Sequence, residues 1–288
     1  MKTIYKIYLL FLLFPAVNAS AQKQYLKRSV YSIAESIVEN STKTAHYIPL
    51  FGAGDDSSMI IKGVERFGFL TIDPEGSSNT VRFAVEEQVY YILDGTGVLS
   101  YGKEVIPVGK NDFIYLPAGV NSKFSNPRER PLTVCVMGFK IQPGNMVSPA
   151  TRMMIANADD VTFQVLGSHG TTTQFQLLMG TTGSTRDKLA ASCQVSSLFV
   201  MDFAPGGTNI AHRHEDEEEI YFVLRGEGEM VAGETSEGKE LRHPAKMGDA
   251  YFFSPNTLIG FYSENSEGEE HSRILAVRFA YPSQKEEP

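Results

Sequence analysis

The sequence predicts an all-β protein built from two antiparallel units in tandem, and three observations support this. Short apolar and aromatic runs are separated by Gly, Pro and Asn about every ten residues, which is typical of strands joined by turns. The chain contains 25 Gly, 18 Phe and 13 Tyr, residue types that favour turns and strands. Two segments also resemble each other, so one β unit is expected twice within the 288 residues.

Composition and charge exclude two classes of protein. Apolar residues make up 42% of the chain, which is enough to bury a core and excludes an intrinsically disordered chain. The formal net charge is −8 at pH 7. A general nucleic-acid binder needs a basic surface, so nucleic acid is not an expected partner.

The first 21 residues have the pattern of a secretory signal peptide. Two lysines precede an apolar run at 7–14, and Ala19-Ser20-Ala21 forms a small-residue cleavage site. The apolar run is too short to span a bilayer, and no later run is long enough. We therefore expect cleavage near Ala21 and a secreted or periplasmic protein with no membrane contact after the signal is removed.

Residues 22–50 are expected to form an N-terminal arm that precedes the first β unit. Helical periodicity is clear only in the segment SVYSIAESIVEN at 29–40, which predicts a short helix within the arm.

The internal repeat sets the predicted domain organisation. Segments 86–104 and 217–234 align at a constant offset, which places Tyr90 on Tyr221. Each contains a Gly-x-Gly hairpin signal after an apolar run. The predicted units are 51–145 and 176–282, separated by a connection at 146–175 that contains Pro and Gly among short apolar runs.

The two cysteines leave their pairing open. Cys135 and Cys193 both lie in apolar, strand-like runs. An exported protein could join them, but they could equally be buried free thiols, because sequence does not reveal their separation.

A candidate metal site lies in the second unit. His212 and His214 are two residues apart, so on a strand their side chains point to the same face. Glu219 begins the next apolar alternation and can face the same interior if a turn intervenes. Two imidazoles and a carboxylate suit a divalent transition metal and leave positions open for water, substrate or dioxygen. The acidic run 215–219 could instead be only a solvated loop.

Strand alternation decides between two neighbouring glutamates. Glu219 shares its parity with Tyr221 and Val223, which we expect to face the interior of the unit, whereas Glu218 has the opposite parity. Glu219, and not Glu218, is therefore the expected ligand. Tyr221 is a candidate catalytic residue whose hydroxyl would orient a ligand or act as an acid; the alternative is simple core packing.

The spacing around these residues resembles the first motif of the cupin superfamily. The motif consists of Gly206, five residues, His212-x-His214, four residues, Glu219, six residues and Gly226. Residues 248–255 resemble the second cupin motif, and residues 111–119 of the first unit match that motif more fully. The chain therefore resembles a two-domain cupin, or bicupin, over about residues 50–282, which implies two jelly-roll barrels in tandem.

The resemblance also implies that the first barrel holds no metal. At the offset of the repeat, Val81 and Phe83 stand where the two histidines stand in the second barrel. Gln88 replaces the glutamate, and Ser122 replaces the histidine of the second motif. Apolar side chains cannot hold a metal, so packing, dimerisation or ligand shaping is the expected role of this barrel.

In the second barrel the resemblance leaves one ligand missing. The family's fourth ligand, a histidine, falls on Gly260. We expect a centre with three protein ligands, because the nearby His243 and His271 are predicted to lie away from the barrel interior. Arg278, in the apolar strand 274–279, could anchor a carboxylate inside the barrel, but it is expected to face solvent or to form a salt bridge.

Cupins include dioxygenases, decarboxylases, isomerases, hydrolases and binding proteins, so the fold alone does not give the function. A His-His-Glu centre with open positions resembles that of non-haem iron oxygenases. This implies an exported dioxygenase-type oxidoreductase that acts on a small oxygen-bearing substrate and uses Fe²⁺ or Mn²⁺, with Zn²⁺ or Ni²⁺ as alternatives.

Two other functions stay open. One is a metal-dependent hydrolase or isomerase, similar to ureidoglycine aminohydrolase or to sugar-acid enzymes, in which the metal acts as a Lewis acid. The other is a non-catalytic cupin that binds a sugar or another small molecule. The expected partner is a small-molecule substrate, and formation of a homodimer is left open.

Overall fold

The computed structural model confirms the all-β prediction. It describes residues 24–55, 60–145, 147–264 and 271–281, which form 19 strands and two short 3-10 helices. The predicted signal peptide lies outside the described residues. Within the described part of the chain, no helix is long and apolar enough to cross a membrane.

The N-terminal jelly-roll barrel consists of a six-stranded sheet and a three-stranded sheet. The strand orders are β10-β7-β4-β9-β3-β2 and β6-β5-β8, and neighbouring strands in both sheets are antiparallel. The bounds are β2 Ala45–Gly52, β3 Val64–Ile72, β4 Glu86–Asp94, β5 Thr96–Tyr101, β6 Glu104–Gly109, β7 Asp112–Leu116, β8 Ser122–Ser125, β9 Leu132–Lys140 and β10 Met154–Asn157.

The C-terminal jelly-roll barrel repeats this plan with a seven-stranded and a three-stranded sheet. The strand orders are β1-β17-β14-β19-β13-β11-β12 and β16-β15-β18. The bounds are β1 Tyr25–Ser29, β11 Thr173–Thr181, β12 Leu189–Ser192, β13 Val195–Phe203, β14 Glu217–Arg225, β15 Glu227–Glu234, β16 Glu240–Lys246, β17 Asp249–Phe253, β18 Ile259–Ser263 and β19 Ser272–Ala280. The 3-10 helices η1 (Ala158–Asp160) and η2 (Gly167–His169) precede β11.

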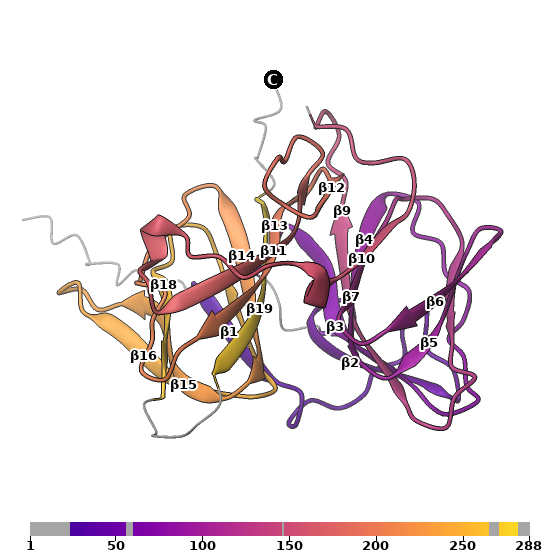
Figure 1. Ribbon diagram of the computed structural model, residues 1–288, viewed down its shortest axis with the longest axis horizontal. Coiled ribbons are helices and arrows are strands. Elements are labelled where there is room, and N and C mark those ends of the chain that lie inside the picture. Colours follow the sequence, from indigo (N-terminus) through magenta and orange to yellow (C-terminus); the bar gives the residue numbers. More distant parts are fainter. Residues whose placement is uncertain (1–23, 56–59, 146, 265–270, 282–288) are drawn as a thin grey trace, which may run out of the picture.

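The two barrels exchange an edge strand. β1 leads into the N-terminal barrel but pairs with β17 of the C-terminal one, and β10 leads into the C-terminal barrel but pairs with β7 of the N-terminal one (Figure 1). β7 and β17 occupy matching positions in the repeat, so the exchange is reciprocal. The sheets therefore extend beyond the predicted limits of the units, since β10 lies within the predicted connection.

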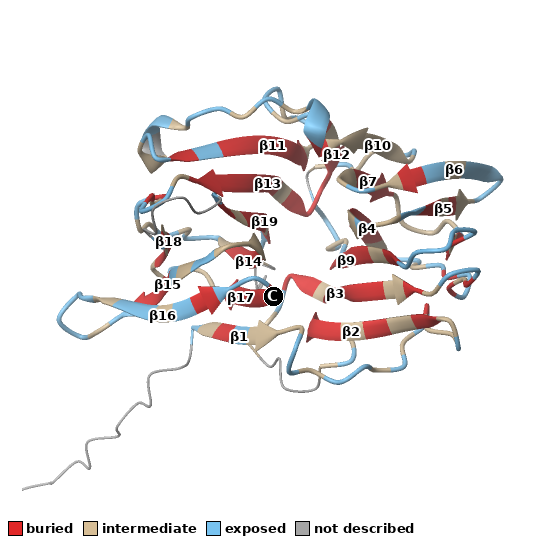
Figure 2. Cartoon of the chain, turned by 60° about the horizontal axis from the view of Figure 1, so that its bottom comes forward, coloured by how far each residue is buried: buried red, intermediate tan, exposed pale blue. Residues whose placement is uncertain are grey.

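Three hydrophobic clusters hold the molecule together. One fills each barrel, and the third and largest lies between the two large sheets. In β14 the alternation divides neighbours between clusters, because Ile220 and Phe222 face the opposite barrel while Tyr221 and Val223 face their own barrel's interior. The central strands are thus buried on both faces, as the red strands in Figure 2 show, which explains their nearly continuous apolar sequences.

A matched pair of buried glutamates joins the barrels. The Glu87 carboxylate accepts hydrogen bonds from the backbone N–H groups of Cys193 and Gln194 at 3.1 and 2.9 Å. At the equivalent position of the repeat, the Glu218 carboxylate accepts from the N–H groups of Gly63 at 2.6 Å and Lys62 at 3.1 Å. Each barrel therefore satisfies backbone donors of the other with a carboxylate that is 0% exposed.

The predicted helix at 29–40 is wrong. In the structure this segment forms turns and bends, and the N–H of Ser36 bonds to the carbonyl of Tyr47 in β2. Because β1 belongs to one barrel and β2 to the other, the segment must cross between them. Its apolar side chains serve different places, since Ile33 packs against the inter-barrel cluster while Ile37 is 96% exposed.

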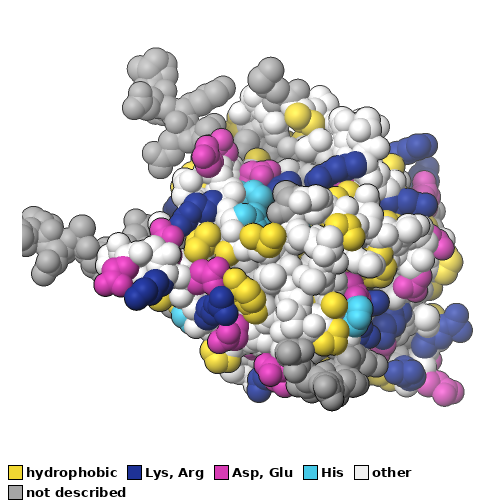
Figure 3. Space-filling model, turned by 60° about the vertical axis from the view of Figure 1, so that its left-hand side comes forward, with side chains coloured by type: hydrophobic (Ala, Val, Ile, Leu, Met, Phe, Trp, Pro, Cys, Tyr) yellow, Lys and Arg dark blue, Asp and Glu magenta, His cyan; other side chains and the backbone are white. Residues whose placement is uncertain are grey.

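Cys135 and Cys193 are both buried free thiols, so the structure forms no disulfide between them. The surface of the C-terminal barrel carries acidic and basic side chains interspersed with one another, as Figure 3 shows for one face (Figure 3).

Candidate metal centre

Backbone hydrogen bonds fix both histidines beside the small sheet of the C-terminal barrel. His212 forms an isolated antiparallel bridge with Ile259, with N···O distances of 2.9 and 2.8 Å. The carbonyl of His214 accepts from the N–H of Asn256 at 2.7 Å. The loop that carries the histidines is therefore held against the start of β18.

The structure brings the three predicted ligands together. One ligand atom from each of His212, His214 and Glu219 lies within 4.8 Å of the others. Within the described residues, no other set of three or more His, Cys, Asp or Glu side chains gathers in this way. Nε2 of His214 lies 3.3 Å from Oε2 of Glu219.

The Glu219 carboxylate shows that this cluster suits a cation. The side chain is only 2% exposed, and neither of its oxygens has a hydrogen-bond partner. Nε2 of His214 is close enough to Oε2 of Glu219 for an ion pair, but the two groups are not oriented for a hydrogen bond. A buried carboxylate without partners is costly, and a divalent ion would satisfy both oxygens.

His212 is prepared to act as a ligand. Its Nδ1 lies 2.9 Å from the carbonyl of Ile210, which can only accept, so Nδ1 carries the proton and Nε2 is free. Burial lowers the pKa of His212, which favours the neutral imidazole that metals bind.

The predicted strand parity is confirmed. Glu219 points toward the histidines, and Tyr221 and Val223 lie in the core of their own barrel. Glu218 instead reaches the backbone of the N-terminal barrel. It is therefore committed to the contact between the barrels and does not face the metal cluster.

Arg278 lies at the edge of the cluster. Its Nε is 3.0 Å from Oε2 of Glu217, so it forms a salt bridge, which was one of the expectations from the sequence. Its Nη1 also lies 3.4 Å from Nδ1 of His214. A guanidinium at this distance brings positive charge to one side of the site.

Tyr221 points inward, as predicted, and is 1% exposed. The side chain of Asn209 donates a hydrogen bond to its hydroxyl at 3.3 Å. Burial raises the pKa of Tyr221 well above its usual value. The hydroxyl therefore stays protonated and can donate a hydrogen bond to an acceptor.

The equivalent place in the N-terminal barrel is filled by other chemistry. Val81 forms the same backbone bridge, with Ser122, that His212 forms with Ile259. The Arg66 guanidinium stacks on Phe83 at 4.0 Å and pairs with Glu86 at 3.1 Å. A fixed guanidinium thus occupies this region, which supports the expectation that the first barrel holds no metal.

The other histidines considered from the sequence lie elsewhere. The His243 ring packs against Tyr25, and His271 is paired with Asp202. Sequence reasoning missed His169, whose ring centre is 4.8 Å from that of His212. It lies far before His212 in the sequence and belongs to no motif, so no sequence signal marked it.

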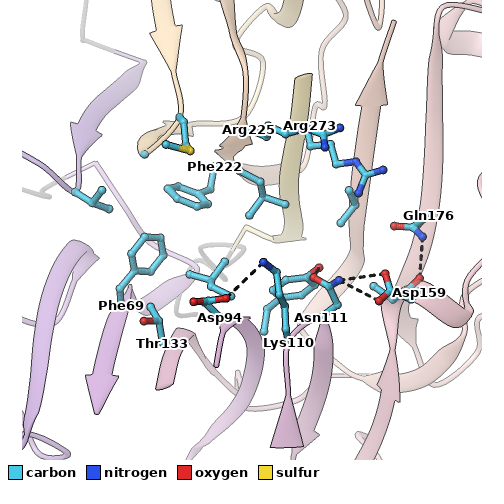
Figure 4. Close-up of a pocket in the computed structure, with 18 of the residues that line it drawn as sticks. Phe69, Asp94, Lys110, Asn111, Thr133, Asp159, Gln176, Phe222, Arg225 and Arg273 are labelled. Atoms are coloured by element: carbon cyan, nitrogen blue, oxygen red, sulfur yellow. Dashed lines mark hydrogen bonds and ion pairs between the residues drawn. The ribbon is translucent and has the colours of Figure 1, made fainter. Parts of the chain in front are cut away.

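A pocket of about 670 Å³ lies between the barrels, and its lining does not include His212 or His214 (Figure 4). Phe69 and Phe222 form part of its wall, and several of its polar groups are paired with one another or with neighbours. Examples are Lys110 with Asp94 at 3.5 Å, Asn111 with Asp159 at 3.1 Å and Arg273 with Asp202 at 2.5 Å. The chemistry therefore points to the histidine cluster and not to this pocket.

Comparisons with known proteins identify the family of both units. The sequence pattern of the cupin domain family matches residues 68–138 and 199–277. Germin-like protein subfamily 2 member 4 of Arabidopsis thaliana is 33% identical over 102 residues, which are 35% of this chain and 46% of that protein. The chain thus spans about half the length of this curated relative.

Solved structures share the fold at low sequence identity. Ylba from E. coli has a TM-score of 0.67 at 13% identity, and the match covers 91% of this chain and 93% of the Ylba chain. Oxalate decarboxylase of Lactobacillus farciminis, in a formate complex, has a TM-score of 0.63 at 10% identity, with 90% and 86% covered. Bacterial pirin YhhW of Escherichia coli, in complex with nickel(II), has a TM-score of 0.64 at 13% identity, with 90% and 100% covered.

Proposed function

Because this chain belongs to the cupin domain family, we propose that its C-terminal barrel holds one divalent transition metal on His212, His214 and Glu219. We further propose that the protein is a metal-dependent enzyme of the dioxygenase type, acting on a small oxygen-bearing substrate. The signal-like first 21 residues support export of the enzyme.

The buried and unpartnered carboxylate of Glu219 carries the proposal. A structural glutamate would be expected to bond to backbone or side-chain donors, as Glu87 and Glu218 do in this same chain. Glu219 instead faces two imidazoles whose donor atoms lie within 4.8 Å. Two related solved structures are named for nickel(II) and for oxalate decarboxylation, which supports a metal and a small oxygen-rich acid here.

A metal bound by three protein groups would supply open coordination positions for substrate oxygens or dioxygen and act as a Lewis acid. The protein's own residues would then orient the substrate. Arg278 brings a positive charge beside His214 and would attract the anionic end of the substrate. Tyr221 keeps its proton and would donate a hydrogen bond to a substrate oxygen. Fe²⁺ and Mn²⁺ are the proposed ions, and Zn²⁺ and Ni²⁺ are the alternatives.

The test is oxygen consumption with defined metals. Protein stripped of metal and reloaded with Fe²⁺ or Mn²⁺ is expected to consume dioxygen with at least one member of a panel of small hydroxy, keto and dicarboxylic acids. Zn²⁺-loaded protein should not do so, because Zn²⁺ has no redox chemistry. The matched control is the His212→Ala variant treated in the same way, which should show only background consumption.

Other outcomes separate the alternative functions. Turnover with Zn²⁺ in the absence of dioxygen would replace the dioxygenase with a hydrolase or isomerase. Binding of a small acid or sugar without turnover under any metal would contradict the enzyme and leave a binding protein.

A further inference from the structure

Strand β18 of the small sheet cannot complete the metal centre. Ile259 points into the apolar core of the C-terminal barrel. A Cβ at Gly260 would meet the backbone of Ala211 at 3.0 Å, so a side chain there would press on the loop and could not reach the ligands. A fourth protein ligand must therefore come from another element.

His169 lies beside His212 in space, although it is outside the motif at 206–226 in the sequence. It ends η2, which precedes β11, and its ring packs against Phe175 with ring centres 5.0 Å apart. On its other side the ring meets His212, with centres 4.8 Å apart and planes at 74°. His212 meets His214 in the same way, at 4.9 Å and 83°. His212 thus has one imidazole neighbour from the motif and one from outside it.

This spacing is compatible with coordination of one ion by neighbouring imidazoles. With a metal–nitrogen distance of about 2.1 Å, two neighbouring imidazoles on one ion have ring centres about 4.5 to 5.2 Å apart. Both observed separations fall in this range. Stacking of aromatic rings does not by itself place three histidines together beside an unpartnered carboxylate.

The protonation of His169 also matches that of a ligand. Its Nδ1 lies 3.1 Å from the backbone carbonyl of Asn209, which can only accept, so Nδ1 carries the proton and Nε2 is free. His212 is held in the same way by Ile210. Metal-binding histidines commonly donate their other ring N–H to such a carbonyl, which fixes the ring for binding.

Asn209 connects this arrangement to the rest of the site. The residue is 0% exposed, and its side chain donates to the Tyr221 hydroxyl and accepts from the N–H of Phe261 in β18. The carbonyl that orients His169 therefore belongs to a fixed part of the barrel. A defined carbonyl position gives the imidazole a defined direction.

We propose that His169 is the fourth protein ligand of the metal in the C-terminal barrel. The proposal rests on the metal site proposed above. His169 is not among the three side chains whose ligand atoms lie within 4.8 Å of one another, so its ring must approach them when an ion binds.

The experiment compares metal affinity and the number of bound imidazoles. Metal-free protein is titrated with Co²⁺ by calorimetry, and the Cu²⁺ form is examined by pulsed electron paramagnetic resonance to count coordinated imidazoles. Wild-type protein is expected to show three imidazoles, and His169→Ala two. His169→Ala should also bind Co²⁺ at least about tenfold more weakly, since even residues that only support a ligand contribute that much.

Two control variants separate ligation from folding. His46→Ala removes a histidine in the N-terminal barrel, which bonds to Glu35 and Asp73, and should leave Co²⁺ affinity unchanged. His169→Glu supplies a carboxylate in place of the imidazole and should recover part of the affinity lost in His169→Ala, while still giving two imidazoles. A purely structural role would not make Glu a better replacement than Ala.

The outcomes distinguish this proposal from the metal site itself. One bound Co²⁺ per wild-type chain with two imidazoles, and unchanged affinity in His169→Ala, would overturn His169 as a ligand and leave the three-residue site intact. Absence of Co²⁺ binding by wild-type protein would overturn both.

Discussion

Glu219→Gln is expected to weaken the binding of Fe²⁺ or Mn²⁺ at least about tenfold, while Glu218→Gln keeps an affinity near the wild-type value. The two substitutions are nearly isosteric and adjacent, so the comparison isolates the charge at the ligand atom. Glu219 faces His212 and His214, whereas Glu218 accepts hydrogen bonds from the backbone of Gly63 and Lys62. Titration of both variants at one fixed pH measures the difference.

Glu218→Gln is a matched control because the carboxyl group of Glu218 faces the backbone of the N-terminal barrel and not the histidines. Burial raises the pKa of Glu218 to about 7, although the N–H groups of Gly63 and Lys62 oppose this shift. A glutamine is close in shape and charge to the protonated acid. If Glu218→Gln lost the metal and Glu219→Gln kept it, the assignment of the β14 side chains that point toward the metal site would be wrong by one residue.

Glu87→Ala is expected to lower the free energy of unfolding by about 3 kcal/mol, because it leaves buried backbone N–H donors without an acceptor. The carboxylate bonds to Cys193 N at 3.1 Å, Gln194 N at 2.9 Å and the Tyr115 hydroxyl at 3.3 Å, and also to the hydroxyl of Ser192. These groups come from both barrels, so the variant should weaken the contact between them.

Urea unfolding followed by circular dichroism measures this effect. Glu129→Ala, at an exposed position in the N-terminal barrel, is the matched control and should change stability by less than about 0.5 kcal/mol. Equal unfolding midpoints for Glu87→Ala and Glu129→Ala would refute the role of Glu87 in joining the barrels.

The fold was predictable because its signals are local and repeated. The Gly-x-Gly hairpins and the constant offset between the two segments mark the same strands twice, and each occurrence supports the other. The alternation of Glu219, Tyr221 and Val223 likewise sufficed to assign their facing, since a strand has a period of two residues.

The N-terminal arm was not predictable because distant pairing determines its path. The apolar spacing of 29–40 suits a helix, but β1 pairs with β17, which lies near the other end of the sequence. Val30 and Ile33 pack against the inter-barrel cluster, and Val38 against the core of the N-terminal barrel. Tertiary contacts with two different cores thus override the local helical pattern.

The metal cluster was only partly predictable for a similar reason. His212, His214 and Glu219 lie close together in the sequence, so motif spacing and strand parity identify them. His169 reaches the same place through the connection between the barrels, and nothing in the residues around it distinguishes it from a surface histidine. Its position follows from the hydrogen bond to Asn209 and from packing on Phe175, which only the structure shows.

The metal content of protein purified without a histidine tag tests the central claim most directly. Elemental analysis by mass spectrometry is expected to find one divalent transition metal ion per wild-type chain, none in His212→Ala or His214→Ala, and one in Gln88→Ala. Two ions per chain, or an ion retained in His212→Ala and His214→Ala, would contradict a single centre in the C-terminal barrel.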